Sequence, residues 1–305
     1  MPRLLFRIPL ILICLSVSTT QASIIIDNFS SATNDRFANA DTFILDGFDL
    51  TGLGRSSDGK WGTLISENVF ISSNHSRPSI GASLTFFSSN DPNGGSITRA
   101  VSSGQRIGFT DLWVGVLETP VTHSFSSFTY LTADIIDTSA FQSSALNGAI
   151  GYMVGLSPTA WASSRHDVAI GTNTLDAWVE DSNAAGTTAD ALSAIYRLGL
   201  NDLTYEALLQ GGDSGAPLFV TDGSTLFLAG INWWLGTANL TVDMVESSYQ
   251  LSGFSYVGNY DAAITSFVTT NAVPEPAAFA GLLGVTSLGF AMLRRRRRSP
   301  ILAFQ

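Results

Sequence analysis

The chain has 305 residues, of which 45% are hydrophobic and 13% charged, so it contains enough apolar material for a sizeable core. Seven of its 15 basic residues lie at the two ends, which leaves 8 basic against 24 acidic side chains in residues 23–273, a net charge of about −16. Phosphate contacts require Lys and Arg, so this acidic body argues against a nucleic-acid partner. Few charges combined with many Gly, Ser and β-branched residues favour an all-β fold.

Residues 1–22 have the pattern of a secretory signal peptide. Two arginines precede an apolar stretch over residues 8–17, and Thr20-Gln21-Ala22 supplies small residues where a signal peptidase reads. The alternative is a core strand at the N-terminus, but the three parts follow in the order of a signal peptide. The only cysteine, Cys14, lies in this segment, so the mature domain is expected to contain no disulfide and no thiol nucleophile.

Residues 27–270 show no long helical period and no internal repeat. Short apolar runs separated by Gly, Asn, Asp and Ser predict many short strands, in a pair of barrels or a large sandwich. The elements expected in chain order are a hairpin pairing 63–65 with 69–71, a buried strand over 112–117, helical character over 189–198, a hairpin pairing 218–220 with 226–228 around Asp222-Gly223, and a weak helix over 261–268.

The stretch Gly211-Gly212-Asp213-Ser214-Gly215-Ala216-Pro217 has the features that a nucleophilic serine requires. Flanking glycines permit a tight turn from which the Ser214 hydroxyl projects. The backbone N–H groups of Gly212 and Ser214 are then available to a developing oxyanion. An ordinary Gly-rich turn is the alternative. The longer string, followed by an apolar strand, favours the nucleophile.

This string resembles the active-site segment of chymotrypsin-like (trypsin-fold, S1-type) serine proteases, which place His, Asp and Ser in that order along the chain. Two earlier segments fit the same order. Residues 62–75, which end in His75, resemble the family's histidine segment, and residues 111–121, which begin with Asp111, resemble its aspartate segment. Residues 228–234 and 256–268 resemble a strand beside the substrate and the closing strand and helix. The resemblance covers roughly residues 48–268.

The resemblance implies an all-β domain over 23–270 with two six-stranded antiparallel barrels, the first at about 48–125 and the second at about 130–268. It implies that Ser214 attacks the scissile carbonyl, His75 transfers the proton and Asp111 orients the imidazole. Gly212 and Ser214 would form the oxyanion hole, and Asp213 would organise this loop by pairing with a buried amine. No cofactor and no metal are expected.

The family's pocket-base position, six residues before the serine, falls on Leu208. An apolar or small side chain is therefore expected at the cleavage site, in a pocket that also involves Trp233 and Trp234. The other two histidines, His123 and His166, are expected to be structural or exposed.

Several positions depart from the family's pattern. Ser73-Asn74 stands where Ala-Ala usually precedes the histidine, and Ala216 replaces a common glycine. Lys60 and Ser76 occupy the positions of a disulfide that often bridges the histidine hairpin. No Ile-Val-Gly-Gly start is visible, so Asp213 has no obvious amine partner, and Lys60 is a remote candidate.

The tail over residues 272–298 contains Pro274-Glu275-Pro276, an apolar run over 277–293 and five arginines. A helix of 17 residues would span about 26 Å, just enough for a hydrocarbon core, with the arginines cytoplasmic. The tail resembles the PEP-CTERM sorting signal of Gram-negative bacteria, which an exosortase reads and which is thought to be removed. That resemblance implies export to the cell envelope, cell surface or extracellular matrix. A permanent membrane anchor is the alternative.

Three functions fit these features. The first is an exported serine endopeptidase acting on proteins or peptides. The second is a catalytically inactive protease fold used for binding. The third is a structural matrix protein whose motif matches are accidental. The order of the three motifs favours the first.

Overall fold

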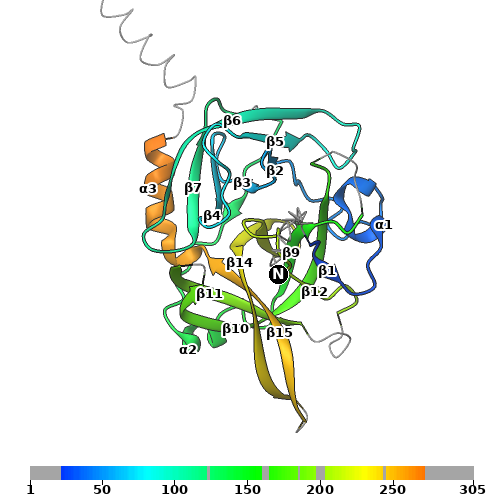
Figure 1. Ribbon diagram of the computed structural model, residues 1–305, viewed down its shortest axis with the longest axis vertical. Helices are drawn as coiled ribbons and strands as arrows, with labels where there is room; N and C mark the ends of the chain where they lie inside the picture. The colour runs from blue at the N-terminus through cyan, green and yellow to red at the C-terminus, as the bar shows by residue number, and fades with distance from the viewer. Residues whose placement is uncertain are drawn as a thin grey trace, which may run out of the picture.

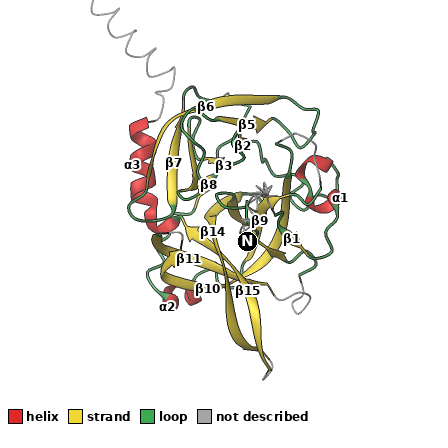
Figure 2. Cartoon of the chain, in the orientation of Figure 1, coloured by secondary structure: helices red, strands yellow, loops and turns green. Residues whose placement is uncertain are grey.

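A computed structural model describes residues 22–121, 124–159, 165–184, 186–196, 203–242 and 245–271. His123, the sorting tail and all but the last residue of the predicted signal peptide lie outside these ranges. No helix in the described part of the chain is long and apolar enough to cross a membrane, and the predicted span over 277–293 is not included in it. Strands are the main regular structure in the described chain, and the helices are few and short (Figure 2).

The first barrel is built from residues 53–117 (Figure 1). Its strands close in the order β2-β3-β4-β7-β6-β5. The predicted hairpin is confirmed as β3–β4, with Leu64 opposite Phe70, and the predicted buried strand is confirmed as β7. The strands are β2 (Leu53–Ser56), β3 (Trp61–Leu64), β4 (Val69–Ser73), β5 (Ser83–Phe87), β6 (Ser96–Arg106) and β7 (Leu112–Leu117).

The second barrel is built from residues 150–256. Its ring runs β13-β9-β10-β11-β15-β14 and closes because β13 also pairs with β14. The predicted hairpin around Asp222-Gly223 is confirmed as β13–β14. A short strand, β8 (Thr129–Tyr130), runs parallel to β14 at its edge. The ring strands are β9 (Ile150–Leu156), β10 (Val168–Ala184), β11 (Thr187–Tyr196), β13 (Pro217–Thr221), β14 (Leu226–Val242) and β15 (Val245–Tyr256).

The expectation of two six-stranded antiparallel barrels is thus confirmed, but the helix expected over 189–198 is wrong. Thr187–Tyr196 forms strand β11, hydrogen-bonded to β10 on one side and β15 on the other. Its alanines suit a helix by local propensity, but Ala189, Ala191 and Ala194 fill buried sites in the barrel, where two ladders satisfy the backbone. The weak helix expected over 261–268 is confirmed as α3 (Asp261–Asn271).

The remaining elements are short. The N-terminal part of the domain forms β1 (Ile25–Ile26), which pairs with β12 (Ala207–Leu208) beside the second barrel. Helix α3 lies along the first barrel near β7 (Figure 1), although it follows the second barrel in sequence. The other short elements are α1 (Ser31–Asn34), η1 (Arg36–Ala38), α2 (Thr138–Ser143) and η2 (Gly258–Tyr260).

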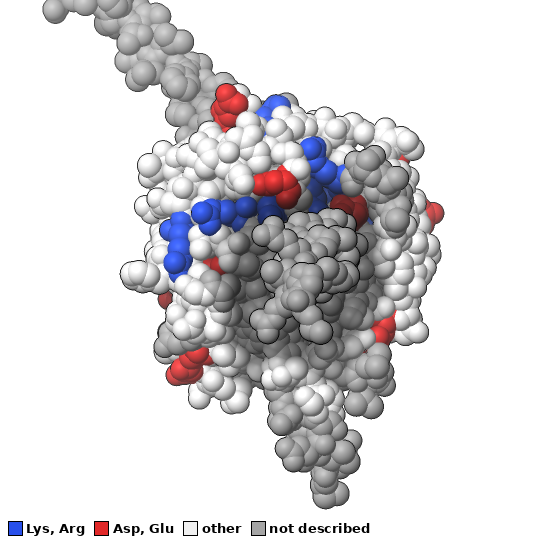
Figure 3. Space-filling model, viewed as in Figure 1, with Lys and Arg blue, Asp and Glu red and all other residues white. Residues whose placement is uncertain are grey.

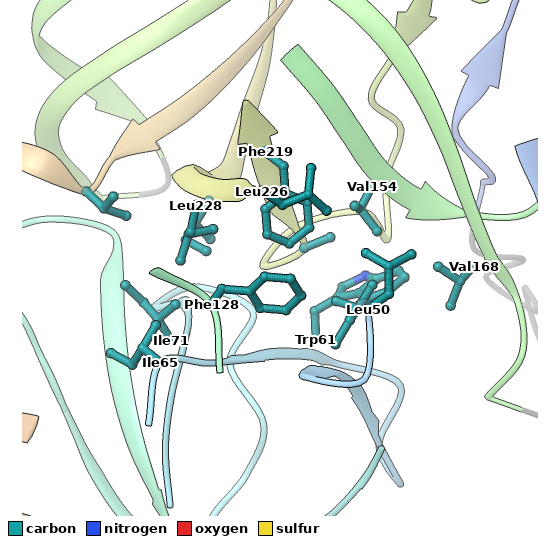
Figure 4. Packing of buried hydrophobic residues seen from close by; sticks show 14 of the residues in the cluster. Leu50, Trp61, Ile65, Ile71, Phe128, Val154, Val168, Phe219, Leu226 and Leu228 are labelled. Carbon is teal, nitrogen blue, oxygen red and sulfur yellow. The ribbon is translucent and has the colours of Figure 1, made fainter. Parts of the chain in front are cut away.

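A shared hydrophobic core joins the two barrels (Figure 4). Trp61 and Ile71 from the first barrel face Phe219 and Leu228 from the second across this layer, and all four are buried. The rings of Phe128 and Phe219 lie 4.6 Å apart. Burial of this much apolar surface fixes the barrels against each other, and the loops that meet at the seam are held in register.

Candidate active site

Strand pairing in the first barrel brings His75 and Asp111 together. Ser73, the last residue of β4, lies opposite Leu112, the first residue of β7, so the residues just outside the ladder face each other. Asn74 N–H continues the ladder by donating to the Asp111 carbonyl at 2.5 Å. His75 Nδ1 then lies 2.7 Å from Asp111 Oδ2, and the His75 backbone N–H donates to Oδ1 at 3.0 Å.

Asp111 is fully buried, whereas the side chain of His75 is 24% exposed. Two contacts to one residue hold the carboxylate in a fixed direction and orient the imidazole. A proton on Nδ1 donated to the carboxylate leaves Nε2 able to accept another. This arrangement suits a general base that faces solvent while its orienting partner does not.

The serine loop reaches this pair from the second barrel. Gly215 has φ +90°, and a Cβ at that position would lie 2.8 Å from Ser72 Oγ and 3.1 Å from Ser73 Oγ. The residue after Ser214 therefore packs against the end of the strand that leads to His75. Only glycine combines this backbone conformation with so close an approach.

Two amides of the loop have no acceptor of their own. In the part of the chain that the structure describes, the N–H groups of Gly212 and Ser214 donate to no protein atom, whereas that of Gly215 donates to the Asn232 carbonyl at 3.0 Å. Gly212 has φ +113°, and its carbonyl accepts from Trp61 Nε1 at 3.1 Å. The carbonyl is thus held by the first barrel while the two amides stay available to a ligand anion.

Asp213 is buried beneath the loop. Its carboxylate accepts from the backbone N–H groups of Leu156 and Gln210, both at 2.7 Å. Burial nevertheless raises the pKa of Asp213 to about 7, because these bonds and the more distant Arg55 offset only part of the desolvation cost. No cation among the described residues forms an ion pair with it.

The start of the domain lies beside this carboxylate. The Ile24 N–H donates to the Leu156 carbonyl at 3.0 Å, and the Leu156 N–H donates to Asp213. A Cβ on Gly155 would lie 2.7 Å from Asp213 Oδ1 and 2.8 Å from Ile24 Cβ. Residues 24, 155 and 213 therefore meet at one buried point.

Lys60, the remote candidate for the amine partner of Asp213, binds elsewhere. Its ammonium donates to Ser76 Oγ at 3.1 Å, so these two residues do meet, as the disulfide positions of the family would. Asn74, the polar residue that precedes His75, accepts from the exposed Arg77 through its side-chain oxygen at 3.2 Å. Its amide oxygen is therefore satisfied by a partner other than His75.

A small cavity of about 140 Å³ opens beside Ser214. Trp233 and Trp234, two of the residues expected in the substrate pocket, line it, and no charged residue is among its described lining. Leu208 lies one residue outside that lining, on β12, where it pairs with Ile25. The cavity is lined by Leu209, Gln210, Gly211, Ser214, Asn232, Trp233, Trp234 and Leu235.

Asn232 is a supporting residue that sequence reasoning missed. It is fully buried, and its amide nitrogen donates to the carbonyls of Val154 and Asp213 at 2.8 and 3.1 Å. Its backbone N–H and carbonyl bind Ala216 and Gly215, so one residue ties both sides of the loop to β14. Its position in an apolar strand was the available signal, because a polar side chain buried among apolar residues usually has hydrogen-bond partners.

His166 is not part of this site. Its ring packs against Phe37 and Phe87, with centroids 4.4 and 4.3 Å away, and burial together with Arg36 lowers its pKa. Within the described ranges, no group of three or more His, Cys, Asp or Glu residues is placed to hold a metal ion.

Neither the models of known protein families nor the curated proteins match this chain. The class is therefore defined by the architecture: two closed six-stranded antiparallel barrels, consistent with a chymotrypsin-like fold. At the seam of these barrels lie a bonded His–Asp pair and a Gly-rich serine loop.

Proposed function

We propose that this chain is a serine endopeptidase that hydrolyses peptide bonds through His75, Asp111 and Ser214. The observation that carries the proposal is the buried Asp111 carboxylate 2.7 Å from His75 Nδ1, next to the strand end against which the serine loop packs. Burying a carboxylate such as Asp111 costs desolvation free energy. A histidine with a purely structural role at the surface does not need such a partner, whereas a general base does.

The proposed reaction proceeds through an acyl-enzyme. Ser214 Oγ attacks the carbonyl carbon of the substrate while its proton passes to His75 Nε2, and the imidazolium then protonates the leaving amine. Water, deprotonated by the same imidazole, cleaves the ester and returns the proton. The free amides of Gly212 and Ser214 stabilise the oxyanion in both steps.

The proposed partner of Asp213 is an α-amino group released when the signal peptide is removed. Predicted cleavage after Ala22 leaves Ser23 first, one residue from Ile24, whose N–H already shares Leu156 with the carboxylate. An ammonium group here would offset the burial of Asp213 and fix the serine loop. Export would thereby be coupled to formation of the oxyanion hole.

The proposed cleavage site has an apolar or small side chain before the scissile bond. The cavity beside Ser214 has a volume of about 140 Å³ and contains two tryptophans and no charged lining residue. An Arg or Lys side chain would lose hydration there without gaining a partner. Profiling with a peptide library checks this, and cleavage mainly after Lys or Arg would overturn it.

Reaction with a fluorophosphonate, which labels activated serines, tests the function. We expect labelling of the processed protein that disappears in Ser214→Ala and falls sharply in His75→Ala. Ser224→Ala, at an exposed turn, is the matched control and should label like the parent. A folded protein that never labels would overturn the endopeptidase and leave an inactive protease fold.

The proposed localisation is the cell envelope, reached through the signal peptide and the tail over 272–298. Mass measurement of the protein recovered from a Gram-negative host checks both ends. Expected losses are residues 1–22 and the tail beyond the Pro-Glu-Pro motif, and an intact chain would contradict this proposal.

A further inference from the structure

A cavity of about 590 Å³ in the described part of the chain lies away from the serine loop. It is formed where β2, β5 and β6 of the first barrel meet the segment 165–167, which leads into β10. Its lining includes Arg55, Arg165, His166 and Asp167.

This cavity concentrates positive charge in an acidic protein. Figure 3 shows Lys and Arg side chains gathered in one band across the face viewed. Every described Lys or Arg lies between residues 36 and 106 except Arg165, so the described positive charge is carried by Arg36, the first barrel and the segment 165–167. The cavity has two guanidinium groups and one carboxylate, that of Asp167, 3.2 Å from Arg55.

The two guanidinium groups lie close enough to repel each other. The pKa of Arg55 is lowered, first by burial and also by the charge of Arg165, while Asp167 and Asp213 oppose the shift. Arg55 is only 5% exposed, and its Nε is a buried donor with no acceptor in the described structure. The other two nitrogens of this guanidinium are bonded, Nη1 to Asp167 and Nη2 to the Gly59 carbonyl. The Nε donor left without an acceptor is costly to bury, and an added acceptor would offset that cost.

The remaining lining can bind a polar ligand. Thr85 is contacted by Arg165 and lies 3.0 Å from Thr98 through their hydroxyl oxygens. His166 adds a buried Nε2 without a partner. Hydroxyls also come from Ser56, Ser57 and Ser96.

We propose that this cavity binds a small organic or inorganic oxyanion, with its carboxylate, phosphate or sulfate group between Arg55 and Arg165. Guanidinium groups bind such anions through paired hydrogen bonds, and the surrounding hydroxyls complete the shell. The site lies outside the proposed catalytic residues and does not require that the protein be a peptidase.

The same cavity is connected to the serine loop. The Arg55 guanidinium carbon lies 4.3 Å from the centroid of Trp61, and Trp61 Nε1 donates to the Gly212 carbonyl. An anion that shifts Arg55 would change this contact and the attraction between Arg55 and Asp213. This regulatory step rests on the proposed function, whereas anion binding does not.

Thermal unfolding of the full chain in phosphate or sulfate, against chloride at equal ionic strength, tests the binding. At about ten times the dissociation constant we expect the midpoint to rise by about 3 °C. Arg165→Gln and Thr98→Asp, the second of which adds a negative charge at the rim, should abolish the rise. Arg99→Gln, a β6 arginine outside the cavity, is the matched control and should retain it.

Equal midpoints in phosphate and chloride for the parent, or an unchanged rise in Arg165→Gln, would overturn the site. Acetate and phosphate arms separate a carboxylate ligand from a phosphate ligand. The regulatory step predicts that phosphate changes the rate of Ser214 labelling in the parent but not in Arg165→Gln. A rise in the unfolding midpoint without any Ser214 labelling would support the anion site and contradict the endopeptidase proposal. A labelling rate that phosphate does not change would contradict only the regulatory step.

Discussion

The environment of the Asp213 side chain disfavours its charged form. The side chain is fully buried and bonded only to backbone amides, so its neutral form is favoured up to a pH of about 7 in the unprocessed chain. Ionising this buried carboxyl group carries a desolvation free energy that a neighbouring cation would offset.

Between pH 4 and 7 the folded chain holds a proton on Asp213 that the unfolded chain releases, so this residue makes stability fall as pH rises through that window. The free energy of unfolding of the unprocessed Asp213→Asn variant, minus that of the parent, should increase by up to roughly 4 kcal/mol between pH 4 and pH 7. Urea unfolding at several pH values measures it. A pH-independent difference would contradict the raised pKa, and a smaller gain in the processed protein would support the amine partner.

At the scale of elements, the end of strand β9 positions the serine loop through Leu156 and Gly155. Leu156 binds both Ile24 and Asp213, and Gly155 lets both approach the strand. The glycine has no Cβ to separate them, so the N-terminal segment and the loop share one edge of one strand.

Gly155→Ala should separate the N-terminal segment from Asp213. We expect a loss of about 1–3 kcal/mol in the free energy of unfolding, because the new Cβ would sit under 3 Å from atoms of Asp213 and Ile24. Labelling of Ser214 should fall with it. Gly211→Ala, where a Cβ meets nothing within 4 Å, is the control for stability. Equal unfolding curves for the two variants would refute this account.

At the scale of the molecule, the site exists because two barrels share a core. His75 and Asp111 belong to the first barrel and Ser214 to the second, and Trp61 crosses the seam through its bond to Gly212. Function would therefore depend on how the barrels sit together as well as on the three side chains.

Trp61→Phe removes that bond while keeping an aromatic ring in the seam. We expect the free energy of unfolding to fall by about 1 kcal/mol in addition to the effect of lost packing. Labelling of Ser214 should be slower, because the Gly212 carbonyl has lost its hydrogen bond. Trp178→Phe is matched, since Trp178 is also buried but its Nε1 has no partner in the described structure. Identical labelling in both variants would show that the seam bond does not position the loop.

Alternating apolar residues, Asp-Gly turns and flanking glycines act over a few neighbours, so the sequence by itself predicted many short strands and the loop motif. The two barrels were implied by the resemblance to chymotrypsin-like proteases. The sequence also predicted His75 and Asp111, which β-sheet register then placed 2.7 Å apart. Only the tertiary structure decided that Ala189 to Ala194 would form a strand, since two neighbouring ladders outweigh local helix propensity. It alone revealed Asn232, the meeting of Ile24 with Asp213, and the cavity at Arg55 and Arg165. Those contacts join residues far apart in the chain, and burial and electrostatics between distant segments leave no local pattern in the sequence.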